Sequence, residues 1–135
     1  MANALYDAGR EAFLDGTISW SSDNIKVVLV DTADYTVNLA TDTALSDIAA
    51  AGRVATSGNL ASKTVTAGVA DAADVTLSAV TGDESEALVI YKDTGVESTS
   101  TLIAYIDTAT NLPVTPNGGD ITIQWDSGAN KIFKL

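Results

Sequence analysis

Short segments with strand-like patterns recur along most of the chain, and glycine, asparagine or aspartate separates one segment from the next. Some segments alternate apolar and hydroxyl-bearing residues, which is typical of strands with one exposed face. Others are apolar at nearly every position, which is typical of strands covered on both faces. The segments are 25–31, 53–57, 63–66, 74–80, 86–92, 101–107, 120–125 and 131–135. Their spacing predicts a mainly β fold, an antiparallel β-sandwich with jelly-roll or Greek-key connections.

Turn residues indicate how several of these segments pair. Residues 93–95 are rich in turn formers, so we expect 86–92 and 101–107 to form a hairpin near the middle of the fold. Residues 126–130 likewise predict that the last two segments form a final hairpin. We interpret residues 68–71 as a turn between two exposed strands.

Helical spacing is confined to the first part of the chain. It predicts one amphipathic helix over about residues 4–15, with Asn3 as its cap and Gly16 as its end. A brief second helix is expected at 44–50, capped by Thr43. The expected inner face of the first helix carries Leu5, Gly9, Ala12 and Phe13.

Residues 1–135 are expected to form a single domain, since no break in composition divides them. A chain of this length buries about two thirds of its unfolded surface, so it needs neither a disulfide nor a metal for stability. Hydrophobic residues make up 46%, but aromatic residues only 6%. The core should therefore consist of many small contacts around a few large side chains.

The chain contains no histidine and no cysteine. Histidine titrates most readily near neutral pH, and cysteine is the strongest ordinary nucleophile, so acid–base chemistry would be left to carboxylates, lysines and tyrosines. Ser85 lies among acids, but nothing in the sequence connects Lys63 or Lys92 to it as an activating base. We therefore predict a protein that is not an enzyme, without catalytic residues; a small hydrolase using carboxylates alone is the lowest-ranked alternative.

The formal net charge is −11, from 18 acidic and 7 basic residues. The basic residues are scattered rather than gathered into a stripe, so direct binding of nucleic acid is not expected. Anionic membrane surfaces are disfavoured for the same reason. No apolar run approaches the ~20 residues that span a bilayer, so no membrane partner is predicted.

Acidic turns offer the only plausible metal ligands. The acidic run 83–86 and the pairs Asp31/Asp34 and Asp71/Asp74 could each supply oxygens to Ca²⁺ or Mg²⁺. Aspartate is nevertheless common in turns because its side chain bonds to its own backbone, and the spacing does not match an EF-hand. We therefore expect solvated turns, and predict neither a metal nor a cofactor.

Aromatic side chains could in principle form a platform for sugars. Trp125 shares a strand face with apolar residues, and Tyr105 lies within an apolar strand. Core packing is therefore the stronger interpretation for most of the four aromatic residues Trp20, Tyr91, Tyr105 and Trp125.

Four segments resemble one known family. They are ALYDAGREAFL at 4–14, NIKVVLVDTADY at 24–35, SEALVIYKDTG at 85–95 and DSGANKIFKL at 126–135. They are similar to small virion structural proteins of tailed bacteriophages, and the likeness extends over nearly the whole chain. The resemblance implies a component of a phage particle, made in the host bacterial cytoplasm.

Within a particle, small size and high acidic charge favour a capsid decoration or cement protein. Such proteins bind the outer face of the capsid shell, so the expected partners are the major capsid protein and copies of the chain itself, as a trimer or dimer. The first helix and residues 38–59 are the candidate contact regions, because they interrupt the β pattern. The candidate interface residues are Leu5, Gly9, Ala12, Phe13, Leu39, Leu45, Ile48 and Val54. A tail or adsorption component, forming a ring or binding host glycan, is the alternative.

Overall fold

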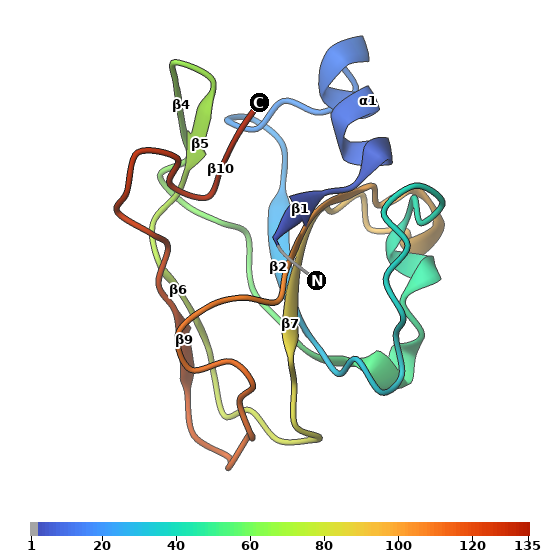
Figure 1. Cartoon of the computed structure of the whole chain (residues 1–135), viewed down its shortest axis with the longest axis vertical. Helices are drawn as coiled ribbons and strands as arrows, with labels where there is room; N and C mark the ends of the chain where they lie inside the picture. The colour runs from blue at the N-terminus through green and yellow to red at the C-terminus, as the bar shows by residue number, and fades with distance from the viewer. Residues whose placement is uncertain (1–2) are drawn as a thin grey trace.

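A five-stranded antiparallel sheet in the order β1-β8-β7-β2-β3 forms the centre of the fold (Figure 1). The computed structural model describes residues 3–135. The strands of this sheet are β1 (Ala4–Leu5), β2 (Ile25–Val30), β3 (Arg53–Thr56), β7 (Ala87–Lys92) and β8 (Leu102–Ile106). β2 and β7 pair along their whole length, and the expected hairpin of β7 with β8 is confirmed.

The middle strands are covered on both faces, as their apolar sequences predict. Val27 and Val28 are neighbours in β2 and point to opposite faces, yet both are fully buried. Val89 and Ile90 in β7 show the same pattern. Two layers must therefore pack against the sheet, one on each face.

Two small antiparallel sheets cover one face. They contain β4 (Thr64–Thr66), β5 (Val69–Asp71) and β10 (Phe133–Lys134), and β6 (Val75–Leu77) with β9 (Ile121–Ile123). Ala70, Leu77 and Ile123 from these sheets share a buried cluster with Leu29 and Ile90 of the central sheet. The sheets therefore pack face to face, and the prediction of a mainly β, antiparallel sandwich with an N-terminal helix is confirmed.

An irregular segment covers the other face. Tyr35, Leu45 and Ile48 pack there against Val28 and Val89 of the sheet. The segment includes two short 3₁₀ helices, η1 (Leu45–Asp47) and η2 (Ala50–Gly52), where the sequence predicts one brief helix. In Figure 1 it lies on the opposite side of β2 and β7 from the small sheets.

The N-terminal helix is shorter than predicted. Helix α1 spans Asp7–Asp15, while Ala4–Leu5 pairs with β8 as a strand. Tyr6 therefore occupies the cap position, and the Asn3 side chain instead accepts hydrogen bonds from the backbone N–H groups of residues 107 and 108. The predicted end is confirmed, because Gly16 has φ 82°, the left-handed conformation that suits glycine.

The predicted final hairpin is wrong. β9 pairs with β6, and β10 pairs with β5, a strand that lies in the predicted turn at 68–71. Ile123 lies opposite Val75, and Phe133 lies opposite Ala70, so each strand pairs with a distant apolar partner across the small sheets. A local turn signal at 126–130 cannot reveal these pairings, because the burial that stabilises them is non-local.

Candidate functional site

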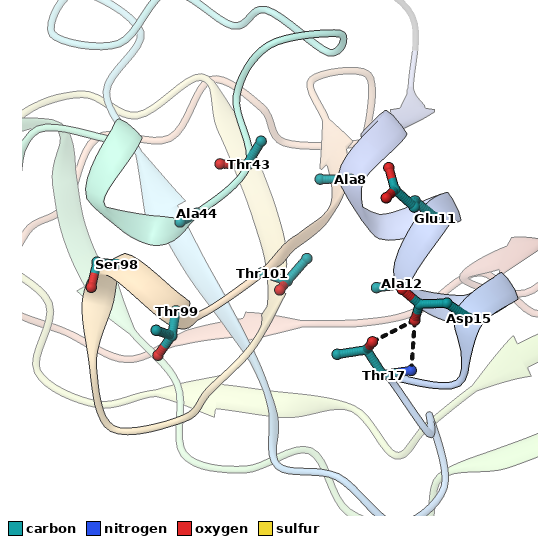
Figure 2. A pocket seen from close by; sticks show the side chains of 10 residues that line it. All are labelled: Ala8, Glu11, Ala12, Asp15, Thr17, Thr43, Ala44, Ser98, Thr99 and Thr101. Carbon is teal, nitrogen blue, oxygen red and sulfur yellow. Dashed lines mark hydrogen bonds between the residues drawn. The ribbon is translucent and has the colours of Figure 1, made fainter.

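The two candidate contact regions meet along one groove of about 310 Å³, which we call the α1 groove (Figure 2). One wall is helix α1, and the other is formed by residues 43–44 together with residues 98–101, which include part of the 3₁₀ helix η3 (Glu97–Thr99). The lining residues are Ala8, Glu11, Ala12, Asp15, Thr17, Thr43, Ala44, Ser98, Thr99 and Thr101.

Helix α1 lies directly on the backbone of β8 because residue 9 is glycine. A Cβ atom at Gly9 would lie 2.8 Å from both Ile103 Cα and the Leu102 carbonyl oxygen. The N–H of Tyr6 donates to the Ile103 carbonyl at 2.9 Å, and the N–H of Asp7 donates to the Leu39 carbonyl at 2.9 Å. The position of this wall is therefore fixed by the sheet and by the covering segment.

The opposite wall is held in place by the Asp47 carboxylate and by a backbone hydrogen bond to Ser100, just before β8. The Asp47 carboxylate accepts the N–H groups of Thr43 at 2.7 Å and Ala44 at 3.1 Å, which hold its pKa below the ordinary value. The N–H of Leu45 donates to the Ser100 carbonyl at 2.9 Å. The loop that carries Thr43 is thus tied to the residues just before β8 that bound the groove.

Small and hydroxyl-bearing side chains dominate the lining, and two carboxylates give it charge. The hydroxyl and N–H of Thr17 donate to the Asp15 carboxylate, as Figure 2 shows, and these bonds lower the pKa of Asp15. In the part of the chain that the structure describes, the Glu11 carboxylate has neither a hydrogen bond nor an ion pair. Such a groove can accept hydrogen bonds and attract a cationic side chain.

Leu14 is an exposed apolar residue of α1 that lies outside the groove lining. Its side chain is 89% exposed, although it belongs to a helix whose inner face is buried. Leu14 follows Glu11 by one turn, so the two side chains are neighbours on the helix surface. Helical spacing does not single out Leu14, because it identifies the inner face of the helix, whereas the informative signal is a leucine opposite that face.

Most of the predicted interface residues lie inside the molecule. Leu5, Gly9, Ala12, Leu45 and Ile48 are buried. Phe13, Leu39 and Val54 are partly exposed and pack against the two core clusters. Among these residues only Ala12 also lines the groove, so the surface offered by both regions consists largely of their neighbours.

Two of the acidic turns come together. The carboxylates of Asp31, Asp34 and Asp83 can each place an oxygen within 4.8 Å of the others, whereas Asp74 instead accepts the backbone N–H of Trp125 at 2.9 Å. Asp31 is buried and accepts the N–H of Ala33 at 2.9 Å. Three such oxygens could contribute to binding of a hard cation such as Ca²⁺, which takes about six to eight oxygen ligands.

Ser85 is poorly placed for attack on a substrate. Its side chain is fully buried, and its hydroxyl donates to the Asp83 carbonyl at 3.2 Å. Lys63 donates to the Asp23 carbonyl, and Lys92 donates to the Thr17 carbonyl at 2.7 Å. Neither lysine has a hydrogen bond with Ser85 among the described residues, so the pairing that a lysine-activated serine needs is not formed.

The aromatic residues divide into core and surface groups. Trp20, Tyr91 and Tyr105 are buried, which confirms core packing for them. The indole N–H of Trp20 donates to the Asp71 carbonyl at 3.0 Å, and its ring meets Phe133 edge-on at 5.2 Å. Trp125 is only partly buried, and it lines a second cavity.

Over residues 3–135, no helix combines the length and apolarity needed to cross a bilayer. Neither a model of a known protein family nor a curated protein matches the chain.

Proposed function

We propose that this chain is a non-enzymatic structural protein of a tailed-phage particle, a capsid decoration protein that binds the outer face of the shell. The four segments that resemble phage virion proteins support the particle assignment. The α1 groove supports a binding role, because both regions expected to make contacts border it. The proposed partners are the major capsid protein and further copies of the chain.

The single observation that carries this proposal is the groove lined by small side chains, with the exposed Leu14 one helical turn from its Glu11. Alanine, serine and threonine let a partner backbone approach closely, and the hydroxyls can exchange hydrogen bonds with it. Leu14 would add apolar area at the edge of the contact. Glu11 and Asp15 would favour a lysine or arginine on the shell protein.

One contact through the α1 groove would be weak, but the contact would be repeated over the whole shell. Simultaneous engagement of neighbouring capsid subunits would raise the apparent affinity without new contacts, because the second binding event becomes intramolecular. The net charge of −11 keeps free copies soluble before they bind. Deleting the protein should then lower the resistance of filled heads to heat without blocking head assembly.

The test is cosedimentation of purified variants with DNA-filled heads that lack the protein. Leu14→Glu should weaken binding by about tenfold, the loss expected from about 1.4 kcal/mol at one interface residue. Glu11→Lys should weaken binding further at low salt, because it cancels the net negative charge of the groove and places a cation where a cationic partner residue would bind.

Val65→Glu is the matched control, since Val65 is 58% exposed and lies on β4 in the small sheets. It should bind like the unaltered protein. Unchanged binding by both groove variants would overturn the proposed contact surface, and so would an equal loss with Val65→Glu.

A further inference from the structure

A second cavity, of about 600 Å³, lies where β9 meets the segment that follows β8 and the residues before β10. We call it the Trp125 cleft. Its volume falls in the range of small-molecule sites, about 300–1,000 Å³. It is separate from the α1 groove, with which it shares no lining residue.

Apolar side chains form one part of the lining. Ile106, Ile123 and Ile132 lie there together with Trp125. The indole N–H of Trp125 donates to the Ala73 carbonyl at 3.1 Å, so the group left to contact a ligand is the hydrocarbon surface of the ring. The N–H of Trp125 donates to Asp74, which fixes the backbone that carries the ring.

Neutral polar side chains form the rest of the lining. Gln124 and Asn111 are exposed, and in residues 3–135 neither side chain takes part in a hydrogen bond. Each amide offers two donors on nitrogen and an acceptor oxygen. Thr110 and Ser127 add hydroxyl groups to the same lining.

The charges of the lining are few and of both signs. Lys131 and Asp126 are the ionisable residues among those that line the cleft. A phosphate-rich ligand would meet a single cation in a chain of net charge −11, so nucleotides and anionic polymers fit poorly. A lipid chain would leave the amides without partners.

We propose that the Trp125 cleft binds a neutral saccharide. A pyranose ring has an apolar face of C–H groups and an edge of hydroxyls, and the cleft presents the matching pair of surfaces. The C–H face would stack on Trp125, while Gln124 and Asn111 would hydrogen-bond to the hydroxyls. This site is independent of shell binding through the α1 groove.

The test is titration of the ¹⁵N-labelled full chain with neutral oligosaccharides of glucose, galactose, mannose and N-acetylglucosamine, followed by NMR. At least one should shift the indole resonance of Trp125 and leave that of the buried Trp20 unchanged. Gln124→Ala should lower the affinity by about three- to tenfold, which corresponds to one lost hydrogen bond.

Asn111→Gly tests the second amide, because Asn111 has φ 70° and glycine keeps that backbone conformation. It should have a similar effect, and Trp125→Phe should weaken binding while preserving an aromatic ring. Asn130→Ala is the control, since Asn130 is an exposed amide outside the lining. The proposal is overturned if no oligosaccharide shifts Trp125, or if the cleft variants bind as well as Asn130→Ala.

Discussion

The hydroxyl groups of Tyr6 and Tyr35 lie 2.8 Å apart in the core, between the central sheet and the segment that covers it. The Tyr35 hydroxyl donates to the Asp42 carboxylate at 2.7 Å, so its oxygen accepts the proton of Tyr6. The same Asp42 oxygen accepts the N–H of Asn38 at 2.8 Å. This series of hydrogen bonds connects Tyr6, just before α1, to residues 38–42, which lead into the other wall of the α1 groove.

Tyr35→Phe should destabilise the protein more than Tyr6→Phe. The first variant removes two hydrogen bonds, the one that the buried Tyr6 hydroxyl donates and one of those that Asp42 accepts, at a cost of about 2–3 kcal/mol. The second variant keeps the bond to Asp42 and costs about 1 kcal/mol. Urea unfolding of the two variants measures the difference. An equal or larger loss in Tyr6→Phe would contradict the direction of the bonds.

Stability should fall above pH 10. Burial raises the pKa of Tyr6, Tyr35 and Tyr105, and raises that of Tyr91 to about 12, so all four tyrosines favour the neutral form in the folded state. In the unfolded chain they ionise near pH 10. Their contribution is therefore complete below pH 10 and is lost as the pH rises toward and beyond 12.

Urea unfolding at several pH values from 8 upward measures this loss, and each tyrosine adds at most about 1.4 kcal/mol per pH unit to the slope. Tyr35→Phe should show a shallower slope. Phenolate absorbance that rises around pH 10 while the protein remains folded would contradict the account.

Gly9→Ala should destabilise the protein by about 1–3 kcal/mol, although alanine is the better helix former. The new Cβ would press on the backbone of Ile103, which cannot move without distorting β8. Gly58→Ala is the matched control, because a Cβ there meets nothing within 4 Å, and it should change stability by less than about 0.5 kcal/mol. Thermal unfolding of both variants tests this, and a neutral Gly9→Ala would show that α1 does not lie so close to the sheet.

Asp83→Asn should raise the free energy of unfolding by about 0.5 kcal/mol, since it relieves repulsion among Asp31, Asp34 and Asp83. The gain should shrink at high salt. The measurement is urea unfolding in EDTA, with Glu84→Gln as a control that removes the same charge outside the cluster. A loss of stability in Asp83→Asn would contradict the account, and a Ca²⁺-dependent stabilisation that this variant abolishes would show that the cluster binds a cation.

The sequence predicts those elements whose own residue pattern indicates that they are buried. β2 and β7 are apolar on both faces, so their central position follows from their composition. The end of α1 follows from Gly16. The partner with which a segment pairs cannot be predicted in this way. Leu5 has helical spacing from Gly9, yet it pairs with β8 because the sheet edge offers backbone hydrogen bonds there.

The candidate site is less predictable for the same reason. The α1 groove needs residues 43–44 and 98–101 to lie beside the helix, and the tie between Leu45 and Ser100 that places them is long-range. The approach of Asp83 to Asp31 also depends on long-range packing. In the Trp125 cleft, the alternating pattern predicts Trp125 as the last residue of a strand over 120–125, but it does not reveal that free amides line the same cleft.

The most direct test of the proposed function is the number of copies of this protein on purified, DNA-filled heads that have been separated from tails. Quantitative mass spectrometry against the major capsid protein gives that number. A decoration protein should remain on the heads at a copy number comparable with that of the shell protein. Its absence from the heads, or its recovery with the tails alone, would contradict the account.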